Sequence, residues 1–195
     1  RVGSFTPLAS WLPQTGYSLS GTTLTISGSS KTMTGIDVAG YRVINTGNTN
    51  ILEDLSGDYN TTGQTGNKRQ WDIRGANPTV RYSKLTNPTP VGGVYGLATF
   101  DATGTITLVH CDIRDAAAQD VIAGPDVGGG ANVLMVTDCL IKGIHLTVGA
   151  HVDPIDLRGA APTSTVRRTM IIGDKTPTSA PAGSGTGFTN AFHDL

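Results

Sequence analysis

Residues 108–113 read Leu-Val-His-Cys-Asp-Ile, and residues 136–141 read Val-Thr-Asp-Cys-Leu-Ile. The same pattern, an aliphatic residue, then a small residue and then another aliphatic residue, occurs in residues 80–85 and 166–171. Successive copies begin 28, 28 and 30 residues apart. The three columns are Val80, Leu108, Val136 and Val166; Ser83, Cys111, Cys139 and Thr169; and Leu85, Ile113, Ile141 and Ile171. Agreement of three columns over four copies indicates a repeat architecture.

A repeat of this length with short aliphatic strands predicts an all-β fold, a parallel β-helix. In such a coil each turn supplies two or three short strands, and equivalent residues of successive turns stack about 4.8 Å apart. Leucine-rich repeats have a similar length, but the chain lacks their Leu-x-x-Leu-x-Leu framework. A second strand per turn is expected at residues 120–124 and, 33 residues later, at residues 153–159. Residues 94–96 are expected to be the matching strand of the first copy.

Composition excludes several other classes of protein. The chain has 195 residues, which is enough for one domain with a sizeable core. It contains 26 Gly and 28 Thr but a single glutamate, Glu53, which leaves little material for long helices. Helix bundles, coiled coils and doubly wound α/β folds are therefore excluded. The net charge of -1 argues against a nucleic-acid partner, and no apolar run is long enough for a membrane span.

The sequence divides into three stretches. Residues 1–65 are interpreted as an N-terminal arm and irregular early coils of the β-helix. Residues 66–175 are interpreted as the regular parallel β-helix, and residues 176–195 as a loop and the start of a further strand. A coil that stops without a cap exposes an open β edge, so we expect a longer natural chain or a partner that covers this end.

Two stretches resemble a known family. Residues Asn132–Ile141 (NVLMVTDCLI) and Gly149–Asp156 (GAHVDPID) resemble the strand and His-x-Asp-Gly-Ile-Gln motifs of the pectate-lyase-like superfamily, its bacteriophage members above all. In the second motif Pro154 replaces the glycine and Asp156 replaces the glutamine. The resemblance covers residues 66–175 and implies a right-handed parallel β-helix. The superfamily includes polysaccharide lyases, glycoside hydrolases and bacteriophage tail spikes and fibres, so the resemblance leaves activity open.

The candidate catalytic residues are Asp120, Asp153, Asp156 and His151. Stacking of the second strands would make Asp120 and Asp153 neighbours, and two close carboxylates serve as acid and nucleophile, or acid and base, in glycoside hydrolysis. The competing interpretation is turn chemistry, because an aspartate before Pro154 starts a turn by bonding to nearby backbone. His151 is then a surface or capping residue.

A second group of residues is a candidate for glycan binding. Trp71 and Tyr82 would be aromatic platforms for sugar rings. The residues that would neutralise acidic sugars are Arg114, Arg158, Arg167 and Arg168. The competing interpretation is that these are ordinary solvated side chains, with arginine–aspartate pairs between turns.

Cysteines and acids give little indication of a metal site. Cys111 and Cys139 share a column, one turn apart, which is compatible with a disulfide or with an inward stack of free thiols. The neighbouring column is Tyr82, His110, Asp138 and Arg168. It holds one acid, which does not favour calcium, and no His/Cys cluster has transition-metal spacing. No metal and no cofactor is predicted.

The function most favoured is that of a bacteriophage virion appendage: a tail spike, tail fibre or capsid-surface protein. Its β-helix rod would be structural and would bind a bacterial cell-surface polysaccharide. The expected partners are copies of the chain in a homotrimer, or other virion proteins, and the expected location is the virion or the extracellular space. The alternative is a polysaccharide lyase or glycoside hydrolase acting on a bacterial surface glycan. Whether the chain is an enzyme stays open, with the balance toward a binding role.

Overall fold

The computed structural model describes residues 4–58, 68–86, 94–114, 118–123, 132–144, 153–156 and 163–173. These residues form mainly strands, joined by short turns and bends, and one short helix near the N-terminus, α1 (Leu8–Trp11). The prediction of an all-β fold is confirmed.

The described strands build three sheets, numbered here in the order in which each turn from β3 onward passes through them. Sheet 1 consists of β2 (Tyr17–Ser20), β3 (Thr23–Ile26), β6 (Arg42–Asn45), β9 (Lys68–Ile73), β12 (Val94–Phe100), β15 (Ala118–Ala123) and β18 (Asp153–Asp156). Sheet 2 consists of β4 (Thr32–Thr34), β7 (Ile51–Glu53), β10 (Thr79–Arg81), β13 (Thr105–Val109), β16 (Val133–Thr137) and β19 (Thr165–Arg167). Sheet 3 consists of β1 (Thr6–Pro7), β5 (Ile36–Asp37), β8 (Ser56–Asp58), β11 (Lys84–Thr86), β14 (Asp112–Arg114), β17 (Leu140–Ile144) and β20 (Met170–Gly173).

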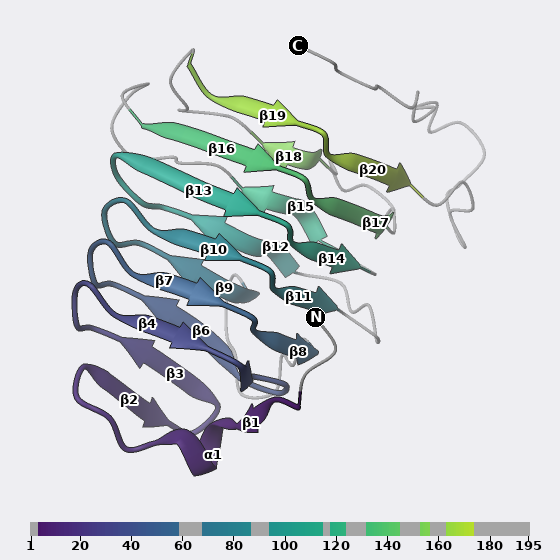
Figure 1. The fold of residues 1–195 in the computed structure, drawn as a ribbon. Coiled ribbons are helices and arrows are strands. Elements are labelled where there is room, and N and C mark those ends of the chain that lie inside the picture. The colour runs from purple at the N-terminus through teal and green to yellow at the C-terminus, as the bar shows by residue number, and fades with distance from the viewer. Residues whose placement is uncertain are drawn as a thin grey trace.

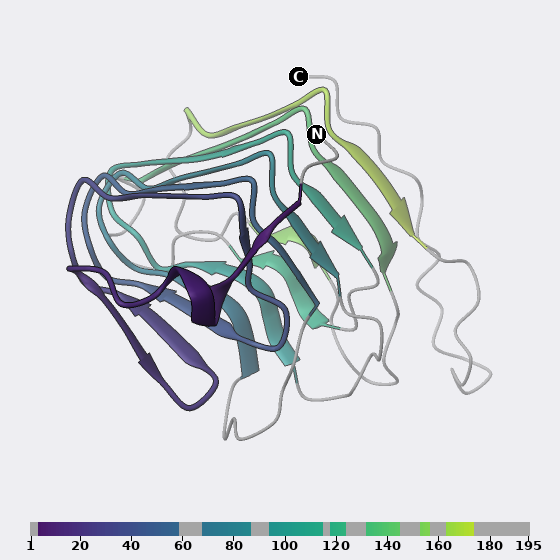
Figure 2. The same cartoon turned by 60° about the horizontal axis from the view of Figure 1, so that its bottom comes forward.

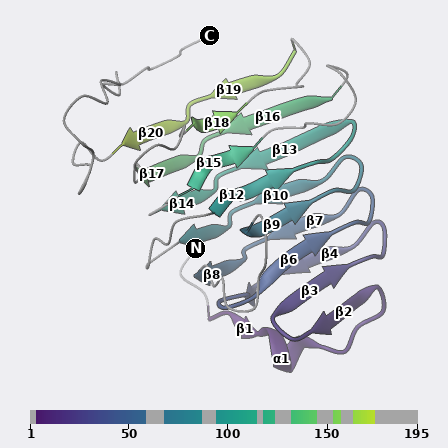
Figure 3. The same ribbon diagram turned by 180° about the vertical axis from the view of Figure 1, so that it is seen from behind.

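The chain passes through sheets 1, 2 and 3 once per turn and then starts the next turn directly above, as the rising colours of Figure 1 show. Viewed with the N-terminal end toward the reader, the chain runs clockwise as it recedes, so the coil is right-handed (Figure 2). From behind, the strands of sheet 1 lie one above another from β3 to β18 (Figure 3). All described strand pairs are parallel except β2 with β3, which is antiparallel.

The register between turns confirms the columns read from the sequence. In sheet 2, Val80 pairs with Leu108, Leu108 with Val136, and Val136 with Val166. In sheet 3, a second column pairs Leu85, Ile113, Ile141 and Ile171 in the same way. The expected second strands are present as well, because Val94 pairs with Ala118 and Asp120 with Asp153.

The aliphatic columns point into the coil and form its core. Val80, Leu108, Ile113 and Ile141 are all 0% exposed. Alternation along a strand places every second side chain inside, and each such side chain is worth about 1.5–3 kcal/mol of burial. The stacked turns therefore hold together through one continuous apolar interior and a ladder of backbone hydrogen bonds.

The ladders also run through the N-terminal third of the chain. Met33 and Leu52 extend the sheet 2 column, and Gly57 extends the sheet 3 column. A Cβ at Gly57 would lie 2.9 Å from Val38 Cγ2, so a side chain from another position fills this part of the core. The same sheets therefore lie on both sides of residue 65, where the sequence suggested a boundary.

The N-terminal end of the coil is covered by α1 and β2 (Figure 2). Leu8 of α1 is 1% exposed and belongs to the core. Trp11 packs edge-on against Tyr17 with ring centroids 4.6 Å apart. This short helix closes the end of the apolar interior, which would otherwise meet water.

Candidate functional site

The corner between sheets 2 and 3 holds one residue per turn in the left-handed backbone conformation. We call these stacked residues the corner column; they are Gly35, Asp54, Tyr82, His110, Asp138 and Arg168. Their φ angles lie between 46° and 70°. A left-handed residue turns the chain sharply enough to leave one sheet and enter the next. Five of the six positions are occupied by residues with a Cβ, for which this conformation costs roughly 1–2 kcal/mol each.

Backbone hydrogen bonds hold each corner to the turn above it. The Tyr82 amide donates to the Val109 carbonyl at 3.0 Å, and the His110 amide donates to the Thr137 carbonyl at 3.1 Å. The Asp138 amide donates to the Arg167 carbonyl in the same way. The ladder thus continues around the corner, and it keeps the side chains of the column one turn apart.

The side chains of the corner column contact one another along the coil axis. Tyr82 stacks on His110, with ring centroids 5.1 Å apart and an angle of 12° between the planes. Arg168 donates from Nε and Nη2 to the two carboxylate oxygens of Asp138, at 2.6 and 2.8 Å. His110 Nε2 lies 3.9 Å from Asp138 Oδ2 and joins the aromatic pair to the ionic pair.

A surface groove of about 560 Å³ lies along this corner. Its walls include His110, Asp138 and Arg168 from the corner column, with Asp112 and Leu140 from sheet 3. The hydrogen bond from Arg168 lowers the pKa of the Asp138 carboxyl below its usual value of 3.8, so this carboxylate is ionised at neutral pH. The side chains of Tyr82, His110 and Arg168 all face solvent, and Arg168 is 68% exposed.

The column of small residues next to the corner has a hydrogen-bonding role. The sequence had indicated only that these residues are small. Ser83 Oγ donates to the Arg81 carbonyl and accepts the Leu55 amide of the turn below at 3.0 Å. Cys139 and Thr169 repeat this arrangement, each contacting the carbonyl two residues earlier and an amide of the turn below. A hydroxyl or thiol here therefore satisfies backbone groups at the bend.

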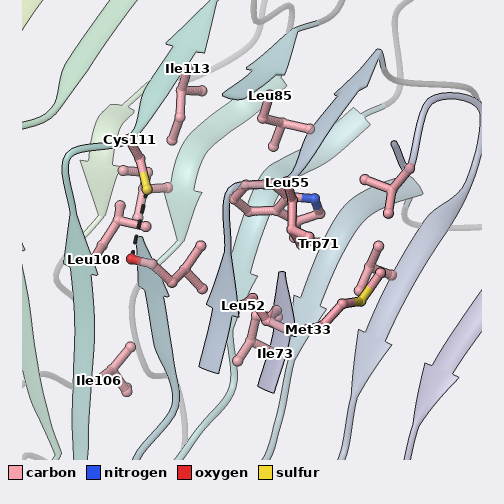
Figure 4. Close-up of a cluster of buried hydrophobic side chains, with 14 of the residues drawn as sticks. Met33, Leu52, Leu55, Trp71, Ile73, Leu85, Ile106, Leu108, Cys111 and Ile113 are labelled. Carbon is pink, nitrogen blue, oxygen red and sulfur yellow. Dashed lines mark hydrogen bonds between the residues drawn. The ribbon is translucent and has the colours of Figure 1, made fainter. Parts of the chain in front are cut away.

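Both cysteines are buried and free, in agreement with the inward thiol stack and not with a disulfide. The side-chain hydrogen bond with Cys139, followed by burial, raises the pKa of the Cys111 thiol well above its usual value. Cys111 is consequently a neutral thiol that packs as a small apolar side chain (Figure 4).

The prediction that Trp71 is an aromatic platform for sugar rings is wrong. Trp71 is 0% exposed and lies inside the cluster of buried side chains with Leu55 and Leu85 (Figure 4). Strand alternation places Trp71 on the same face as Ile73, which is also fully buried. The buried ring therefore offers no face to a sugar.

The other predicted glycan-binding residues have mixed outcomes. Tyr82 is 47% exposed, as a platform requires. Arg114 donates from Nε and Nη2 to Asp112 at 2.6 Å each, so it is held by an acid of its own strand. Arg168 is held by Asp138 in the turn below, which is the arginine–aspartate pairing of the competing interpretation. Arg158 lies outside the described residues.

The predicted catalytic residues are placed only by their main chain. Asp120 and Asp153 are partners in the parallel register of β15 and β18, as expected from the stacking of second strands. Asp156 pairs with Ala123 at the end of the same strands. The side chains of these aspartates, and all of His151, lie outside the described residues.

A buried ionic cluster was missed in the sequence. Asp72 is 0% exposed and accepts hydrogen bonds from Arg42 at 2.5 Å and from Arg74 at 2.8 and 2.7 Å. Hydrogen bonding to Asp72 raises the pKa of Arg74. Arg42 lies 30 residues before Asp72, so only the register of β6 with β9 brings them together. In the sequence, only the two-residue spacing of Asp72 and Arg74 pointed to this cluster. The same spacing occurs at Asp112 and Arg114, which also form an ion pair.

Neither a metal centre nor a membrane segment is found in the part of the chain that the structure describes. There, no three His, Cys, Asp or Glu side chains are grouped so that they could hold a metal ion. None of the helices among those same residues has the length and apolar character needed to cross a bilayer. Comparison of the chain with family models, with curated proteins and with solved structures finds no match.

Proposed function

We propose that the chain is a bacteriophage virion appendage whose β-helix is a rigid rod that binds a glycan on the bacterial surface. The virion setting rests on the motif resemblance at residues 132–141 and 149–156. The rod rests on the register of the three sheets, because each turn pairs with the next and leaves little freedom between them.

The observation that carries the binding role is the choice of residues in the corner column. Glycine or asparagine would occupy the left-handed conformation with less strain, yet this corner presents Tyr82, His110, Asp138 and Arg168. Backbone strain that persists in a structure is often retained for function. An exposed aromatic ring beside a carboxylate and a guanidinium is a surface that can pack against a sugar ring and bond to its hydroxyls.

The binding role is tested with purified protein on an array of bacterial surface polysaccharides. We expect saturable binding to at least one polysaccharide of the array. The virion role is tested separately, by antibody labelling of intact particles and by light scattering of the purified chain. Labelling at symmetric positions and a trimeric mass support the appendage, whereas a monomer that is absent from particles contradicts it.

One observation favours a second candidate, a polysaccharide lyase or glycoside hydrolase. Asp120 and Asp153 occupy equivalent positions in adjacent turns of sheet 1, where neighbouring strands lie about 4.8 Å apart. Paired carboxylates of this kind can catalyse glycoside hydrolysis.

The enzyme candidate makes its own prediction. Asp153→Asn abolishes release of oligosaccharide from the bound polysaccharide, whereas the matched change Asp37→Asn, in β5 of sheet 3 and outside the corner groove, leaves that release unaltered. Absence of any released oligosaccharide from the unmodified protein rejects the enzyme candidate and leaves the binding role in place.

A further inference from the structure

The charges of the corner groove are already matched within the protein. Arg168 uses two of its three nitrogens on the two oxygens of Asp138. Arg114 is bound in the same bidentate way to Asp112, which is on the groove wall. Each pair joins one positive and one negative charge, so the groove carries no unpaired cation among these residues that an acidic ligand could neutralise.

The same pairs retain the capacity to bind hydroxyl groups. A carboxylate oxygen can accept more than one hydrogen bond, and a guanidinium can donate five. Asp138 is 25% exposed and Arg168 is 68% exposed, so both are accessible from the groove. A hydroxyl can accept from the arginine and donate to the aspartate without separating them, whereas a ligand carboxylate must compete with Asp138 for the guanidinium.

The aromatic pair supplies the apolar part of the surface. Tyr82 and His110 stack in adjacent turns directly below Asp138. Aromatic rings favour the apolar faces of sugar rings as well as hydrocarbon, and their contribution does not depend on the ligand's charge. The column therefore runs along the coil axis from an aromatic section to a section with free capacity to bond to hydroxyls.

From this arrangement we propose that the corner groove binds a neutral glycan at His110, Asp138 and Arg168, with its chain aligned along the coil axis and continuing onto the exposed ring of Tyr82, which stacks on His110. The proposal rests on the proposed glycan-binding function and narrows it to one site and one class of sugar. For Arg114 and Arg168 it reverses the expectation from sequence that the arginines select acidic sugars, because both are neutralised within the protein.

The test uses the full chain on an array of bacterial polysaccharides, half of them neutral and half containing uronic or sialic acids. We expect the neutral members to be preferred. Tyr82→Asn should lower the affinity for the best neutral polysaccharide about tenfold, since it removes the aromatic surface while fitting the left-handed backbone. Thr49→Asn is the matched control, because Thr49 has a φ of 55° at a different corner and should bind like the unmodified chain.

A third variant separates ligand recognition from stability. Asp138→Asn leaves Arg168 without its charged partner, so we expect this variant to gain affinity for acidic polysaccharides and lose its preference for neutral ones. Preference of the unmodified chain for acidic polysaccharides, or neutral-glycan binding unchanged in Tyr82→Asn and Asp138→Asn, overturns this inference but keeps the proposed function. Absence of binding to every polysaccharide rejects both.

Discussion

At the scale of single residues, the left-handed corner explains most of the local chemistry. The conformation aligns Tyr82, His110, Asp138 and Arg168 in one column, and their contacts follow from that alignment. Exposed ion pairs contribute little to stability, and the stack adds only about 0.5–1.5 kcal/mol. These contacts therefore offset only part of the strain at four positions, which is why we assign the column to binding.

The Asp138–Arg168 pair gives a pH prediction. Because the folded pKa of Asp138 is lowered, its contribution to folding is present above the ordinary pKa of 3.8 and is lost as the pH falls through the lower, folded value. Carbon-detected NMR titration should show the Asp138 carboxyl titrating below 3.8, and returning toward 3.8 in Arg168→Met. An unchanged titration in Arg168→Met would contradict the pairing.

Trp71 gives a stability prediction that separates the core from the binding surface. Trp71→Ala removes the largest fully buried side chain and should lower the free energy of unfolding by about 3–5 kcal/mol. Tyr82→Ala, at a half-exposed position, should cost much less. Urea unfolding followed by circular dichroism measures both, and equal losses would refute the assignment of Trp71 to the core.

At the scale of elements, the period of the sequence was sufficient to predict the register of sheets 2 and 3 from residue 80 onward. The columns beginning at Val80 and Leu85 repeat because each inward position faces the same position one turn away. The local sequence Gln-Trp-Asp-Ile in β9 also alternates, and Ile73 could have assigned Trp71 to the interior. The corner groove could not be predicted, because a left-handed φ at a tyrosine or arginine runs against residue preference.

The column of small polar residues is tested at Ser83. Ser83→Ala leaves the buried Leu55 amide without its acceptor and should destabilise the fold by about 1–3 kcal/mol. Ser83→Cys places the residue type of the next two turns at this position and should cost less than Ser83→Ala. Thermal unfolding of the two variants measures the difference, and equal destabilisation would show that size alone matters.

At the scale of the whole molecule, the coil repeats one corner geometry turn after turn. The column advances by one strand spacing, about 4.8 Å, per turn, so side chains that are 28 or 30 residues apart in sequence form one linear surface. A linear glycan would meet these side chains in succession. Sheet 1, where Asp120 and Asp153 are in register, lies on a different side of the coil, so the binding and catalytic hypotheses point to separate surfaces.

The central claim is that the corner column is the ligand surface, and mapping amide chemical shifts during titration with the best-bound polysaccharide tests it most directly. We predict the largest changes at Tyr82, His110, Asp138 and Arg168, spaced 28, 28 and 30 residues apart, with the core strand around Trp71 unaffected. Changes centred on Asp120 and Asp153, with the corner column undisturbed, would contradict the claim and favour the enzyme candidate.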